Sequence, residues 1–172
     1  MGRRASREVA MKLLYQLELQ KDDREDQIKT CLEENLLSEI DANYFLDIIE
    51  GVNTNTLYIN KIITRNSKGW KIDRLSKVDL SILRLGIYEM SFREDIPYSV
   101  SINEAVELAK KYSGDEAGAF INGVLGKVAT LNTPNAQEKN NEKISFDEKG
   151  SKAQVSLIKV DKALSIKEKS EE

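Results

Sequence analysis

Three arginines near the start of the chain, Arg3, Arg4 and Arg7, are spaced so that they can bind phosphate groups together. On a helix, residues three and four positions apart share one face, so their guanidinium groups project side by side. The planar guanidinium fork suits phosphate oxygens and base edges, and a helix N-terminus also favours anions. A basic, solvated helix end without a ligand fits the same spacing. In both interpretations we expect the three side chains to be exposed, so that replacing them changes stability little.

The composition removes the side chains most used in catalysis and metal binding. The 172 residues include no histidine and a single cysteine, Cys31, so the chain can form neither an internal disulfide nor a Cys/His zinc site. Histidine is also the residue most used for proton transfer near neutral pH. We therefore expect no catalytic residue, no metal and no cofactor. Because the formal net charge is −3, any nucleic-acid binding must come from a local basic patch.

Helical periodicity of apolar residues extends over most of residues 4–131. Residues 76–92 are apolar around nearly the whole helix, which predicts a central, buried element. Asp41 is the expected N-cap of one helix, and the capping-box spacing of Ser101 and Glu104 predicts that Ser101 begins another. The predicted helices cover 4–20, 25–37, a segment from Asp41 to Ile63 with Gly51 as a weak point, 76–92, a segment from Ser101, and 116–131. Without the alternation typical of strands, this pattern predicts an all-α fold, a compact bundle of six or seven helices.

The last part of the chain, 133–172, differs from the predicted helical domain at 1–132. Lys, Glu, Asn and Ser dominate it, so we expect a polar C-terminal extension that is disordered or loosely docked. A short element that docks through the apolar stretch at 155–160 is the alternative. No stretch approaches the roughly 18 uncharged residues of a membrane span, and we expect a cytoplasmic protein.

Three blocks of sequence resemble the NusB family, in the family's order and spacing, over about residues 2–132. The first block is RRASREVA at 3–10, which continues to Leu14 and Tyr15, and the second is VDLSILRLGIYEM at 78–90. The third comprises IPY at 96–98, INEAVELAK at 102–110 and FINGVL at 120–125. Together the blocks are highly specific. The resemblance implies an all-helical, non-enzymatic RNA-binding bundle.

The resemblance implies a role in transcription. Members of the family bind the boxA element of nascent RNA together with NusE, the transcription name of a small-subunit ribosomal protein. With other Nus factors, the complex modifies RNA polymerase so that it reads through terminators, chiefly in ribosomal RNA operons. Ala5 stands where the family often has a further arginine, which weakens the basic patch.

The resemblance also assigns roles to particular residues. Those expected at the RNA are Arg3, Arg4, Arg7, Glu116, Phe120 and Asn122, and those expected at the NusE contact are Tyr15 and Asp79. The chemistry agrees, because single-stranded RNA is bound by cations on its backbone and flat side chains under its bases. Three of these assignments have a structural alternative: core packing for Phe120, the core edge for Tyr15, and a first-turn carboxylate favoured by the helix dipole for Asp79.

Three further residues have expected structural roles. Trp70, between Gly69 and Lys71, is expected to cover the bundle, and stacking on a base is its alternative. Tyr88 is expected in the core, beside a solvated carboxylate at Glu89.

Two other functions fit a helical bundle. One is a protein-only adaptor that binds its partner through apolar grooves and never touches RNA. The other is an RNA-modifying enzyme, because NusB-like bundles also occur fused to rRNA methyltransferase domains. Residues 133–172 are too few for such a domain, and no glycine-rich cofactor loop follows a strand. The sequence leaves the choice between monomer and dimer open.

Overall fold

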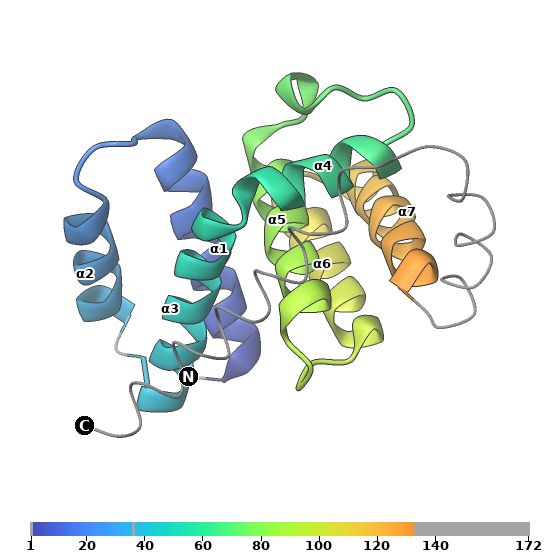
Figure 1. Ribbon diagram of the computed structural model, residues 1–172. Helices are drawn as coiled ribbons and strands as arrows, with labels where there is room; N and C mark the ends of the chain where they lie inside the picture. The colour runs from blue at the N-terminus through green and yellow to red at the C-terminus, as the bar shows by residue number, and fades with distance from the viewer. Residues whose placement is uncertain (1, 36, 133–172) are drawn as a thin grey trace, which may run out of the picture. The chain divides into compact units, whose positions relative to one another are not determined.

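The structure is a computed structural model that describes residues 2–35 and 37–132 (Figure 1). Its elements are α1 (Arg3–Leu19), α2 (Arg24–Asn35), α3 (Glu39–Thr54), α4 (Thr56–Asn66), a 3₁₀ turn η1 (Ile72–Arg74), α5 (Lys77–Phe92), α6 (Tyr98–Tyr112) and α7 (Asp115–Asn132). The prediction of an all-α bundle is confirmed. The polar tail predicted at 133–172 lies outside the described residues. No helix in the described residues combines the length and apolar character that crossing a bilayer requires.

Helix α5 is the centre of the bundle. It contacts α1, α3, α4, α6 and α7, and Figure 1 shows it between α1 and α3 on one side and α7 on the other. Ile82, Leu83 and Ile87 are among its fully buried side chains. Each such side chain contributes roughly 1.5–3 kcal/mol on burial. The prediction that 76–92 forms the buried central helix is therefore confirmed.

Serine side chains cap the starts of α3 and α5. Ser38 accepts a hydrogen bond from the backbone N–H of Asp41 at 3.3 Å, and Ser76 accepts one from that of Asp79 at 3.0 Å. The prediction that Asp41 is an N-cap was therefore wrong. Asp41 lies in the first turn, where its carboxylate accepts a hydrogen bond from the Ser38 hydroxyl at 2.8 Å. The pair differs from a capping box, in which the acid accepts from the backbone N–H of the N-cap residue and not from its hydroxyl.

Helix α6 begins earlier than predicted. Pro97 is its N-cap residue, and the Pro97 carbonyl accepts hydrogen bonds from the N–H groups of Val100 and Ser101 at 3.0 and 3.2 Å. The predicted start at Ser101 was wrong, because Pro97 has an extended backbone (φ −60°, ψ 143°) and the helix begins directly after it. Ser101 is buried inside the helix. The Glu104 carboxylate forms ion pairs with Arg4 and Arg7 of α1 and not with the start of its own helix.

A break at Asn55 divides the long helix predicted from Asp41 to Ile63 into α3 and α4. The Asn55 side chain donates a hydrogen bond to the Gly51 carbonyl at 2.7 Å, and the Thr56 hydroxyl donates one to the Val52 carbonyl at 2.8 Å. These side chains offer the carbonyls alternatives to backbone N–H groups, which favours a helix end.

Gly51 lies inside α3 for a packing reason. A Cβ atom at this position would overlap the ring of Tyr88 on α5. Tyr88 is buried, as predicted, and its hydroxyl donates a hydrogen bond to Asp47 at 3.0 Å. The missing side chain at position 51 therefore lets α3 and α5 approach closely.

Gly51→Ala should lower the free energy of unfolding by about 1–3 kcal/mol, the usual cost of overpacking a core. The matched control is Gly126→Ala in α7, where a Cβ atom would meet no atom within 4 Å. This control should raise the stability by up to about 1 kcal/mol through helix propensity. Urea unfolding of both variants measures the difference. Stabilisation by Gly51→Ala would contradict the close approach of α3 and α5.

Candidate nucleic-acid interface

Arg7 is buried inside the bundle. Its side chain is 3% exposed, and its Nε donates a hydrogen bond to Glu89 Oε1 at 2.8 Å. A second nitrogen of Arg7 lies 3.5 Å from the carboxylate of Glu104. Glu89 itself is 0% exposed. The predictions of an exposed Arg7 and a solvated Glu89 were both wrong, because the two charges compensate each other in the core.

Tyr44 completes this buried group. Its hydroxyl donates a hydrogen bond to the same Glu89 oxygen at 2.6 Å. Its ring centroid lies 4.4 Å from the guanidinium carbon of Arg3, 5.8 Å from that of Arg7 and 5.5 Å from that of Arg93. Burial and the Glu89 charge raise the pKa of Tyr44, so the phenol remains a donor. Burial acts to lower the pKa of Arg7, but Tyr44 and Glu89 raise it above its ordinary value, so the guanidinium stays charged.

We call Arg7, Tyr44 and Glu89 the buried ion-pair cluster. It joins α1, α3 and α5, one residue from each helix. Its sequence signal is Glu89, an acid in a helix that is predicted to be buried on every side. A carboxylate in such a place needs a cation or several donors, and this requirement could have pointed to one of the arginines of α1.

Arg3 and Arg4 are the members of the predicted arginine face that reach the surface. Arg4 is 71% exposed and lies 3.6 Å from Glu104 and 3.9 Å from Glu107, whereas Arg3 is 35% exposed and lies 3.8 Å from Asp95. Exposed ion pairs contribute about 0–1 kcal/mol, so phosphate can replace these partners. Within the described residues no side chain caps α1, and its first turn has no acid. The backbone N–H groups of that turn are therefore also available to bind an anion.

Arg93 lies beside the same arginines, although the sequence did not indicate it. It donates hydrogen bonds to Asp95 at 2.8 and 2.9 Å and to Asp47 at 2.8 Å. The bonds from Arg93 lower the pKa of Asp95 to about 2, so that this carboxylate stays charged beside Arg3. Arg93 directly follows α5, and no spacing rule connects it with the start of the chain.

Phe120 lies in a different environment. It is half-buried on α7, packs against the core, and meets Trp70 edge to face with 6.2 Å between ring centroids. The ring is therefore part of the core edge and is also partly accessible. Glu116 and Asn122 are exposed on the same helix. Trp70 was expected to cover the bundle. Its ring contacts Phe120, but the residue is 54% exposed, so it covers the bundle only in part.

The residues predicted at the NusE contact lie beside an ion-pair group that joins α1 to α5. Glu18 accepts hydrogen bonds from Arg84 at 2.8 Å and from Lys77 at 3.1 Å. Tyr15 is exposed one turn before Glu18, and Asp79 is half-buried in the first turn of α5, two residues after Lys77. The structure thus places both residues within one helical turn of the same group.

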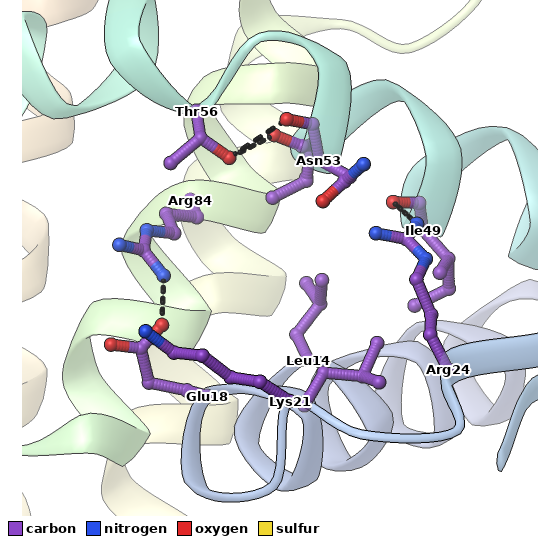
Figure 2. A pocket seen from close by; sticks show the side chains of 10 residues that line it. Leu14, Glu18, Lys21, Arg24, Ile49, Asn53, Thr56 and Arg84 are labelled. Carbon is purple, nitrogen blue, oxygen red and sulfur yellow. Dashed lines mark hydrogen bonds and ion pairs between the residues drawn. The ribbon is translucent and has the colours of Figure 1, made fainter.

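The Glu18–Arg84 pair also borders a cavity of about 430 Å³. Figure 2 shows this pair on one side and Arg24 on the other, with Leu14 pointing between them. Arg24 is held there by a hydrogen bond to the Ile49 carbonyl at 3.1 Å. Charged groups around an apolar interior are typical of protein contact surfaces.

Comparisons with known proteins agree on one family. The model of the NusB family matches residues 4–130. The chain is 60% identical over 141 residues to the transcription antitermination protein NusB of Acetivibrio thermocellus, with 82% of this chain and 97% of that protein covered. The structure of T. maritima NusB matches at 34% identity with a TM-score of 0.72, over 81% of this chain and 98% of that one. A crystal structure of antitermination factors NusB and NusE in complex with dsRNA matches at 29% identity with a TM-score of 0.68, over 75% of this chain and 96% of that one.

Removing Arg7 should destabilise the protein far more than removing another cation of α1. Arg7→Met leaves the Glu89 carboxylate buried and unpaired, which should lower the free energy of unfolding by about 3–5 kcal/mol. Lys12→Met is the matched control, because Lys12 is exposed on the same helix and also forms an ion pair, with Glu8 at 3.2 Å. Its effect should stay within about 0.5 kcal/mol.

A double-mutant cycle with Glu89→Gln separates the pairing from a general loss of packing. Glutamine carries no charge and keeps an acceptor for the Tyr44 hydroxyl, so Arg7→Met/Glu89→Gln should be more stable than Arg7→Met alone. Urea unfolding followed by circular dichroism measures all variants. Equal unfolding midpoints for Arg7→Met and Lys12→Met would mean that Arg7 is solvated.

Proposed function

The chain belongs to the NusB family, and we propose that it is a transcription antitermination factor that binds boxA-type RNA together with a NusE-type ribosomal protein. The relative named for transcription antitermination and the similar complex of NusB, NusE and dsRNA support this role. In this role the protein joins the RNA polymerase elongation complex with other Nus factors. It then helps the polymerase read through terminators in rRNA operons.

The observation that carries the proposal is the pair of accessible arginines at the uncapped start of α1. Arg4 projects into solvent, and Arg3 lies over the ring of Tyr44. Two guanidinium groups and the free N–H groups of a helix start together provide a binding site for successive phosphates. Arg7 supports this surface from inside, because it is too deeply buried to contact RNA. Arg7 and Tyr44 both bind Glu89, and this arrangement holds the Tyr44 ring under Arg3.

We assign the second part of the RNA surface to the start of α7. Phe120 offers a partly accessible ring for a base, and the exposed Glu116 and Asn122 supply acceptors and donors for base edges. Asn122 can both donate and accept, whereas Glu116 can only accept while it is ionised. Phe120 therefore contributes stacking, and the two polar residues contribute selectivity.

We assign the NusE-type partner to the surface around Tyr15 and Asp79. An exposed tyrosine supplies a large, rigid contact area at low entropic cost, which is typical of interface residues. One oxygen of the Asp79 carboxylate is buried and has no hydrogen-bond donor among the described residues. Because Asp79 as a whole is only half-buried, we expect a cationic or hydroxyl group of the partner to approach its carboxylate from the exposed side.

The proposed role is that of a binding protein in the cytoplasm. The relatives are named transcription antitermination proteins. Among the described residues, no group of Asp, Glu, His and Cys side chains is arranged to hold a metal ion. We therefore assign no catalytic step to the chain.

Binding of a labelled single-stranded boxA RNA, followed by fluorescence anisotropy, tests the proposal with and without the NusE-type protein. The partner should tighten RNA binding about five- to a hundredfold, because both proteins share one RNA. Arg4→Gln should weaken binding several-fold and reduce the salt slope by about 0.7 for one lost phosphate contact. The matched control Lys12→Gln removes an exposed, ion-paired cation from the same helix and should leave both values unchanged.

A scrambled RNA of equal length controls for general attraction to the phosphate backbone. Equal affinities for boxA and scrambled RNA, with and without partner, would contradict the proposed function. Binding of the NusE-type protein without any boxA binding would instead favour the protein-only adaptor.

A further inference from the structure

A small aromatic slot lies where the turn after α4 meets α7. It is a cavity of about 190 Å³, and the residues that form it include Lys68, Trp70, Ala119, Phe120, Gly123 and Lys127. The two aromatic rings meet edge to face at an interplanar angle of 60°. Ala119 and Gly123 lie one helical turn apart beside them, and a Cβ atom at Gly123 would meet nothing within 4 Å. The slot is therefore open to solvent, with two rings and two small residues along its walls.

The turn that carries Trp70 is held in one conformation. The Trp70 N–H donates to the Ser67 carbonyl at 3.2 Å, and the Ser67 hydroxyl donates to the Trp70 carbonyl at 2.9 Å. Lys68 and Gly69 both have positive φ, 40° and 84°, which is unfavourable for lysine. Lys127 of α7 donates a hydrogen bond to the carbonyl of Asn66, the last residue of α4, at 2.9 Å. An indole that stands on such a turn, meets Phe120 edge to face and is still more than half exposed is preorganised for a ligand.

The segment that carries the slot has uncompensated positive charge. Residues 61–74 contain one acid, Asp73, against five exposed cations, which are Lys61, Arg65, Lys68, Lys71 and Arg74. In the part of the chain that the structure describes, none of these five forms an ion pair, whereas Arg3, Arg4 and Arg7 all do. On a protein with a net charge of −3, this local excess indicates an anionic ligand.

We propose that the aromatic slot receives one unstacked base of the bound RNA, with Lys68 and Lys127 beside the neighbouring phosphates. This inference rests on the proposed RNA-binding function and adds Trp70 and the basic turn to its surface. An exposed flat ring between cations is the usual arrangement for binding single strands. An acidic protein segment would match the charge, but it would not need an accessible aromatic ring beside an open, small-residue wall.

The intrinsic fluorescence of the full chain tests the proposal without any substitution, because Trp70 is its only tryptophan. Titration with unlabelled single-stranded boxA RNA should quench the emission, with the same midpoint as the anisotropy of a labelled copy. Replacing the nucleotides by abasic ones, one position at a time, should abolish quenching at a single position while the RNA still binds.

Substitutions give a second measurement. Trp70→Ala should weaken RNA binding about five- to a hundredfold, the effect of losing one stacked base, and Trp70→Phe should restore most of the affinity. The matched control is Tyr58→Ala, an exposed aromatic on α4 outside the slot, which should leave affinity unchanged. Circular dichroism of each variant establishes that it is folded.

The outcomes separate this inference from the function on which it rests. RNA binding by anisotropy without a change in tryptophan emission overturns the slot and leaves the RNA-binding function intact. Absence of RNA binding overturns both. Emission that changes with the NusE-type protein and not with RNA assigns the slot to a protein segment and also overturns the proposal.

Discussion

The buried ion pair between Arg7 and Glu89 is the constraint on which the arrangement of the helices depends. Both charges have left water, and the 2.8 Å hydrogen bond between them, with a second bond from Tyr44, compensates for that loss at one Glu89 oxygen, whereas the other oxygen is buried without a hydrogen-bond partner among the described residues. Any shift of α1 against α3 or α5 would break these bonds and leave a bare charge in the core. The pair therefore selects one register for the three helices. In doing so it also sets the direction in which the start of α1 presents Arg3 and Arg4.

The cations that we assign to RNA binding fall into two groups with different consequences. The cations at the start of α1 have carboxylates beside them, Glu104, Glu107 and Asp95. In the proposed complex, RNA would have to displace or accommodate these acids, which would penalise any strand that does not fit their positions. The cations of 61–74 form no ion pairs among the described residues, so they attract any nearby phosphate. The first group is thus suited to discriminate between RNA strands, and the second group to raise the affinity for any RNA. The net charge of −3 gives the protein no general attraction to RNA.

The fold was largely predictable from the sequence because periodicity reports burial of whole helix faces. The all-round apolar pattern of 76–92 placed the central helix correctly. Positions that depend on local competition were harder: Ser38 instead of Asp41 caps α3, and Pro97 instead of Ser101 begins α6. In the site, spacing placed the arginines on one helix but did not distinguish the buried Arg7 from the exposed Arg4. That distinction depends on Glu89, 82 residues away along the chain.

The central claim is that Arg7 acts from inside the bundle and Arg4 acts at the RNA. Nitrogen-15 spectra of the arginine Nε–H groups test it directly on the full chain, free and saturated with boxA RNA. The Arg7 Nε–H should be protected from exchange with water, because its proton lies in a buried hydrogen bond, and its shift should hardly change on RNA binding. The Arg4 signal should exchange rapidly in the free protein and should shift or become protected when RNA binds. An Arg7 signal that exchanges as fast as that of Arg4 and moves with it on RNA addition would contradict the claim.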